Sequence, residues 1–315
     1  MPAAHLLKAS AETVHWGYFD AKLKPVMTIA SGDTVTVTTI SGGRDALPKQ
    51  DSGLDILPEY AEVHSRHEKF GPHIMTGPIH VLDAKPGDSL EVRIGAIEFR
   101  QNWGYNLIRP LGGSIPEDFG SFARSIIIPL DIVAGVAHPP WGGSIPLSPF
   151  FGNIGTAPPV EWGRLSSVAP HAFGGNIDNK ELVAGTTLFL PVFTSGALLS
   201  IGDGHGVQGD GEVCTTAIET ALQGTFEIFL HKGQTITRPI AETPTHLITM
   251  AFDVDLDDAA KDAVREMIKL LGMRKGLSAA DAYSFMSLAC DLRVTQLVNG
   301  NKGIHAMMPK ALLDL

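Results

Sequence analysis

The chain has 315 residues, 44% of them hydrophobic, and a formal net charge of −10. This length and apolar content suffice for a packed core without disulfides. The acidic balance, with no run of lysine and arginine, disfavours nucleic acid as a partner. Cys214 and Cys290 form no C-x-x-C pair, and no segment has the pattern of a signal peptide or membrane span. We therefore expect a cytoplasmic protein that binds neither membranes nor nucleic acid.

Short segments between turn residues make up most of the chain. Glycine and proline number 34 and 21. Alternating or β-branched runs follow glycine turns at residues 31–40, 86–99, 184–194 and 232–237, which is typical of strands. These runs predict a mainly β fold.

The character of the chain changes near its end. From Asp257 onward, apolar residues recur at helical spacing, and Ser278 begins a capping box for a second helix. The predicted fold is therefore mainly β with an α+β C-terminal part. We divide it into a β-rich region with long loops (1–180) and a region with the glycine-rich motif, strands and helices (181–315), the two packing as one unit with a shared active site.

The most unusual segment is GDGHGVQGDGEV at residues 202–213, which contains five glycines. Glycine at this density favours positive φ angles and tight turns. The segment matches G-x-G-x-x-G, but a β-branched run follows it and its acids would repel a phosphate. An EF-hand loop starting at Asp203 would have Cys214 at its twelfth position, where a glutamate is needed.

The alternative to a phosphate or calcium-binding loop is that side chains of this segment bind one metal ion together. Asp203 and His205 are two residues apart, so in an extended backbone they point to the same side. His73, in the constrained segment GPHIMTGP, is a candidate third ligand, although it can equally be a hydrogen-bonding loop residue. Glu212 and Asp210 can act as general base or second-layer carboxylates, or merely form turns.

A second polar loop, HAFGGNIDNKEL at 171–182, offers His171, Asn176 and Asp178 to the same cleft. Asn and Asp are also ordinary turn formers, so both interpretations stay open. No G-x-S-x-G elbow occurs in the chain, which disfavours serine hydrolysis.

Four segments, at residues 71–94, 173–182, 185–213 and 217–219, resemble the acetamidase/formamidase family of small-amide hydrolases. The resemblance extends weakly to 15–37 and 281–299. It implies a mainly β fold of jelly-roll character, a divalent metal in some members, and hydrolysis of short amides to a carboxylate and ammonia. Some relatives act on cyclic amides. Gly206 stands where the family usually has alanine.

The resulting hypothesis assigns a divalent metal, zinc or calcium, to His73, Asp203 and His205. Glu212 is the catalytic base, with Glu98 as the alternative, and Asn176 orients the amide. We expect a small-molecule amide as substrate and a homodimer. Alternative hypotheses are a non-catalytic metal- or carbohydrate-binding jelly-roll module, a γ-lactam hydrolase, and a subunit interface formed by the glycine-rich segment.

Overall fold

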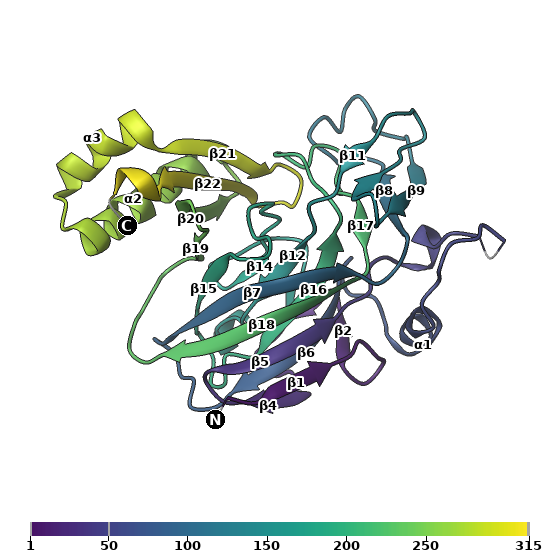
Figure 1. Ribbon diagram of the computed structural model, residues 1–315, viewed down its shortest axis with the longest axis horizontal. Coiled ribbons are helices and arrows are strands. Elements are labelled where there is room, and N and C mark those ends of the chain that lie inside the picture. Colours follow the sequence, from purple (N-terminus) through teal and green to yellow (C-terminus); the bar gives the residue numbers. More distant parts are fainter. Residues whose placement is uncertain (1, 50, 314–315) are drawn as a thin grey trace.

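Figure 1 shows the computed structural model, which describes residues 2–49 and 51–313 and contains two large β-sheets. The first sheet has nine strands within the described residues. In spatial order they are β1 (Ala4–Leu7), β5 (Asp33–Thr38), β18 (Leu222–His231), β7 (Ser89–Phe99), β15 (Thr187–Pro191), β19 (Ile240–Glu242), β20 (His246–Asp253), β22 (Lys302–Pro309) and β21 (Asp291–Gln296).

The second sheet is built around β16 (Leu199–His205). Its main path is β11 (Ile145–Pro146), β10 (Val136–Ala137), β9 (Arg124–Asp131), β8 (Trp103–Ile108), β17 (Glu219–Thr220), β16, β12 (Phe150–Gly155) and β14 (Gly174–Asn176). In addition, β6 (Ile74–Val81) pairs with β16, β2 (Val14–Trp16) and β4 (Met27–Ile29). A separate pair joins β3 (Tyr18–Phe19) to β13 (Leu165–Ser166).

The main hydrophobic core lies between these two sheets. Alternate residues of β5, β7, β15 and β18 meet alternate residues of β6, β12 and β16, and among them Val35, Phe226, Phe151 and Ile201 are completely buried. Burial of each such side chain contributes about 1.5–3 kcal/mol. The fold is thus a β-sandwich, and the period of two in the sequence predicted three strands of its core, β5, β7 and β15.

Three of the four predicted strand segments are confirmed by β5, β7 and β15. The prediction for residues 232–237 is wrong, because β18 ends at His231 and a turn follows. In that turn the Gly233 amide donates to Asp88 Oδ1 (2.8 Å), and the Thr235 hydroxyl donates to the Gly87 carbonyl (2.7 Å). The acceptors of Gly87 and Asp88, in the turn before β7, thus take the place of a neighbouring strand.

Helices pack against the outer end of the first sheet. As Figure 1 shows, α2 (Leu256–Lys275) and α3 (Ala279–Ala289) lie beside β20 and β22. Asp255 caps α2, the Ser278 hydroxyl accepts from the Asp281 amide (3.1 Å), and Gly276 closes α2 at φ 68°. Both predicted helices, and the mainly β fold with C-terminal helices, are confirmed.

Shorter helices occur in the loops: α1 (Glu59–Arg66), η1 (Arg44–Ala46), η2 (Val160–Trp162) and η3 (Lys310–Leu312). No helix in the described part of the chain is both long and apolar enough to cross a membrane. Segments from both sides of the proposed boundary at 180–181 share each sheet, since β5 pairs with β18 and β12 pairs with β16.

Candidate active site

The glycine-rich segment begins inside β16, at the centre of the second sheet. A Cβ atom on Gly202 would lie 2.5 Å from the Ile74 carbonyl oxygen, and one on Gly204 would lie 2.6 Å from the Thr220 carbonyl oxygen. These two glycines therefore let the neighbouring strands approach closely, and they do not form the tight turns that we expected. Among the glycines of the segment, only Gly211 has a positive φ (93°).

Between these glycines, Asp203 and His205 point to the same side of β16. Asp203 Oδ2 lies 3.4 Å from His205 Nε2, and both residues are buried. His205 Nδ1 donates to Gln208 Oε1 (2.9 Å), because the amide nitrogen of Gln208 is used to donate to the Asp178 carbonyl (2.7 Å). The other imidazole nitrogen of His205 is thereby directed toward the carboxylates.

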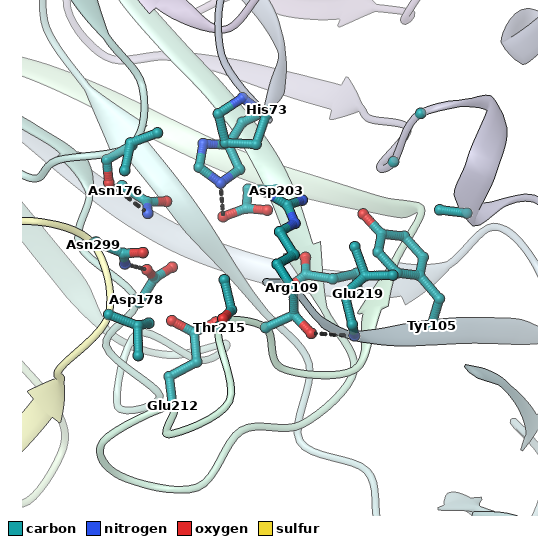
Figure 2. A pocket seen from close by; sticks show the side chains of 18 of the residues that line it. His73, Tyr105, Arg109, Asn176, Asp178, Asp203, Glu212, Thr215, Glu219 and Asn299 are labelled. Atoms are coloured by element: carbon teal, nitrogen blue, oxygen red, sulfur yellow. Dashed lines mark hydrogen bonds and ion pairs between the residues drawn. The ribbon is translucent and has the colours of Figure 1, made fainter. Parts of the chain in front are cut away.

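His73 joins this pair from the residue that precedes β6. Its Nδ1 lies 3.1 Å from the Ser167 carbonyl oxygen, which can only accept, so Nδ1 carries the proton. Its Nε2 faces Asp203 Oδ2 at 3.7 Å (Figure 2). The structure therefore places His73 against Asp203, which contacts His205. In the described part of the chain, the groups of ligand atoms that lie within 4.8 Å of one another do not include those of His73.

Two further carboxylates, Asp178 and Glu219, complete the cluster. Asp178 follows β14; its Oδ1 lies 3.8 Å from His205 Nε2, and its Oδ2 accepts from Asn299 Nδ2 (2.5 Å). Glu219 is the register partner of His205 on β17, and its Oε2 lies 3.3 Å from His205 Nε2. From the sequence alone, the role of Asp178 stayed open and Glu219 was not a candidate, although a single acid in the apolar run AIETAL indicates a buried carboxylate.

Several buried polar atoms of the cluster have no hydrogen-bond partner. They are Asp178 Oδ1, His205 Nε2, Glu212 Oε2 and Glu219 Oε2. Buried polar groups in folded proteins nearly always have partners, so convergent exceptions need an explanation. Ligand atoms of Asp178, Asp203 and His205 all lie within 4.8 Å of one another, as do those of His205, Glu212 and Glu219.

Gly152 on β12 keeps the centre of the cluster open. A Cβ atom there would lie 2.4 Å from Asp178 Oδ1, 2.6 Å from Asp203 Oδ2 and 2.9 Å from His205 Cε1. The residues around this space offer carboxylate and imidazole donors. Their chemistry, their unpartnered atoms and the space itself fit a divalent cation.

The charges of the cluster also favour a cation. Burial raises the pKa of Asp178 to about 8, that of Glu219 to about 7, and that of Glu212 well above its usual range. Burial alone would raise the pKa of Asp203, but His73 and His205 hold it well below the usual value. The pKa of His205 is raised despite burial, because Glu219 and Asp203 surround it. Without a cation, bound protons thus offset part of the negative charge; a metal ion would take their place.

A small cavity of about 80 Å³ opens beside the cluster. Figure 2 shows His73, Asp178, Asp203, Glu212 and Glu219 around it. Lys69 and Arg109, both exposed, also line this cavity. Small polar molecules therefore have space directly against the carboxylate and imidazole groups.

Of the other residues that the sequence suggested for catalysis, one lines the cavity and two are exposed. Asn176 lines the cavity, and its amide donates to the Val168 carbonyl (3.0 Å) and accepts from Asn153 Nδ2 (2.9 Å). Glu98 is exposed, accepts from Gln223 Nε2 (3.0 Å) and is not among the residues that line the cavity. Asp210 is exposed and pairs with Lys180 (2.9 Å).

The fold and the site define a β-sandwich protein with a buried carboxylate–imidazole cluster, suited to a divalent cation, at one wall of a small cavity. The model of the acetamidase/formamidase family matches residues 5–164 and 164–315. The chain therefore belongs to the acetamidase/formamidase family.

Individual relatives agree with this membership. A formamidase of Methylophilus methylotrophus is 30% identical over 250 residues, which are 60% of this chain and 61% of that protein. An acetamidase of Mycolicibacterium smegmatis is 29% identical over 198 residues, 45% of this chain and 49% of that protein. The chain thus spans less than two thirds of the length of these relatives. A crystal structure of an acetamidase from Bacillus halodurans is 31% identical, with a TM-score of 0.84 over 98% of both chains.

Proposed function

We propose that this protein hydrolyses a short-chain amide, such as formamide or acetamide, to a carboxylate and ammonia with the help of a divalent metal. The observation that carries the proposal is the group of Asp178, Asp203 and His205, whose buried ligand atoms converge beside a cavity. Membership of the acetamidase/formamidase family supports the reaction class.

His73, Asp178, Asp203 and His205 would hold the metal. Calcium prefers a shell made only of oxygen ligands, whereas zinc accepts imidazole nitrogen and carboxylate oxygen together. The two imidazoles therefore favour zinc over calcium. When bound, such an ion lowers the pKa of a water molecule to about 7 and polarises a carbonyl group.

Glu212 is the proposed base. It is buried, one of its oxygens has no hydrogen-bond partner, and it lines the cavity. A carboxylate with a raised pKa can take a proton from the attacking water and return it to the departing nitrogen, which leaves as ammonia. The C–N bond breaks in the same sequence, and the acyl group leaves as a carboxylate.

Asn176 is better placed to position His73 than to orient the substrate, because its amide is already engaged on both sides. It accepts from Asn153 Nδ2, which also donates to the Ser167 carbonyl oxygen (3.5 Å), the acceptor of His73 Nδ1. This chain of contacts fixes the His73 ring, which in turn faces Asp203.

The test is ammonia release from formamide, acetamide, propionamide and a γ-lactam, with metal analysis of the same preparation. We expect ammonia from the short linear amides and about one metal ion per chain. No ammonia from any amide would contradict the proposal and favour a binding module. Opening of the γ-lactam alone, measured by loss of substrate, would favour a cyclic-amide hydrolase.

A homodimer and a cytoplasmic location remain predictions. Sedimentation velocity of the purified protein tests the homodimer, and a monomer at micromolar concentration would contradict it.

A further inference from the structure

Thr215 has two unfavourable features at once. Its φ angle is 109°, a region that β-branched residues rarely adopt. Its hydroxyl oxygen is buried and has no hydrogen-bond partner. Both features cost folding free energy, and a glycine at this position would avoid both.

The neighbouring threonine shows that this segment can satisfy a hydroxyl. Thr216 Oγ1 accepts from the Leu107 amide (2.9 Å) and from Asn106 Nδ2 (3.0 Å). The Thr215 amide donates to the Glu212 carbonyl (3.1 Å), so the backbone of the turn is held by a contact that any residue other than proline can make. The side chain of Thr215 contributes nothing visible to the stability of the turn.

The position of Thr215 indicates a use for that side chain. Thr215 lines the same cavity as Asp203 and Glu212, and Figure 2 draws it between Glu212 and Arg109. On its other side lies the loop at Gly112, where a Cβ atom would be 3.1 Å from Thr215 Oγ1. The side chain therefore lies between that loop and the cavity, which Glu212 also lines, and its hydroxyl has no partner.

We propose that Thr215 is a substrate-binding and specificity residue. Its hydroxyl makes a hydrogen bond to the carboxamide group of the bound amide, and its methyl group limits the size of the acyl chain. A hydroxyl can donate to the carbonyl oxygen or accept from the amide nitrogen, so it suits a carboxamide in particular. This inference rests on the amide hydrolysis proposed above.

The experiment compares Thr215→Val, Thr215→Ser and Thr215→Gly with the unmodified protein. Valine keeps the shape and loses the hydroxyl, serine keeps the hydroxyl and loses the methyl, and glycine loses both. Thr249→Val is the matched control, because Thr249 is buried on β20 and its hydroxyl donates to the Ala263 carbonyl (2.8 Å), away from the cavity. Steady-state kinetics with formamide through butyramide and thermal melting are measured for each.

For Thr215→Val we expect KM for acetamide to rise about tenfold with little change in kcat, the pattern of a lost binding contact. Thr215→Ser should retain the KM of the unmodified protein for acetamide. Thr215→Gly should accept propionamide and butyramide about tenfold better relative to acetamide, with a Tm equal to or above that of the unmodified protein. Thr249→Val should show the reverse, a lower Tm with unchanged KM.

Two results would overturn the assignment, and they can be told apart. If the unmodified protein releases ammonia but Thr215→Val keeps its KM, or Thr215→Gly keeps the acyl-chain preference, Thr215 has no part in substrate binding. If the unmodified protein releases no ammonia from any amide, the proposed function is wrong, and the Thr215 assignment is wrong with it.

Discussion

Buried carboxylates occur in two regions of the molecule with opposite hydrogen bonding. In the first sheet, Asp33 at the start of β5 accepts from the Ala3 and Ala30 amides and contacts His5. Both oxygens of Asp88, just before β7, also have donors. In the second sheet, Asp178, Glu212 and Glu219 each keep one buried oxygen without a donor. All five carboxylates have little solvent exposure, but those of the second sheet lie deeper in the protein and have fewer donors.

This difference distinguishes carboxylates that stabilise the fold from carboxylates that have an acceptor oxygen available for a ligand. Fully satisfied acids contribute to stability and leave nothing for chemistry. A buried carboxylate oxygen without a hydrogen-bond donor lowers the stability of the fold. Binding of a cation or a substrate at that oxygen offsets this loss. Substitutions in the two regions should therefore affect different measurements.

The largest expected effect is that of Asp203→Asn. Asparagine also tolerates the φ of 60° found here, so the variant should fold. It removes the charge that both imidazoles face, and kcat/KM for acetamide should fall about a thousandfold or more. Circular dichroism shows whether the variant is folded, and ammonia release measures the loss of activity. A folded variant with near-normal turnover would show that Asp203 is not part of the active site.

Metal removal should have a similarly large effect. Dialysis against a chelator should abolish most of the turnover and lower the Tm, because an ion that binds only the folded state stabilises it. Zinc should restore both properties, and calcium should not. Full activity in a preparation shown to be metal-free would contradict the metal assignment, and restoration by calcium alone would contradict zinc.

Gly152→Ala tests the space at the centre of the cluster. The added Cβ would lie 2.4 Å from Asp178 Oδ1 and should displace the surrounding carboxylates, lowering kcat/KM about a hundredfold. Gly209→Ala is the matched control within the glycine-rich segment, since a Cβ there would meet nothing within 4 Å. Equal activities of the two variants would show that this space has no functional role.

Asp33→Asn should have the smallest effect, and only on stability. Backbone donors from Ala3 and Ala30 lower the pKa of Asp33 to about 2, below the usual value of 3.8 for an aspartate. A lowered folded-state pKa stabilises the fold above pH 4, and this contribution is lost as the pH falls toward 2. We expect a loss of about 1–3 kcal/mol at pH 7 that shrinks below pH 4, with unchanged turnover per folded molecule. Urea unfolding at several pH values measures it; a loss that does not depend on pH would contradict this account.

Local patterns in the sequence predicted the fold class and several of its elements. The period of two predicted β5, β7 and β15, and the helical period and the capping box predicted α2 and α3. The spacing of Asp203 and His205 predicted side chains on one face of a strand. These features depend on near neighbours in the chain, which a single sequence contains.

Features that depend on which strands pair could not be predicted from local sequence patterns. Glu219 reaches the site because it is opposite His205, and Asp178 because β14 lies next to β12. Gly202 and Gly204 are needed for contacts with β6 and β17, whose pairing no local pattern specifies. The same holds for Glu98, whose strand-like run was recognised while its place outside the cavity was not.

The most direct test of the central claim is the metal content of His205→Ala, measured on folded protein beside the unmodified chain. His205 Nε2 faces Asp178, Asp203 and Glu219, so its loss removes the ligand common to the whole cluster. The account predicts about one zinc ion per chain in the unmodified protein, and almost none, with no amide turnover, in the variant. A folded variant that keeps both its metal and its turnover would contradict it.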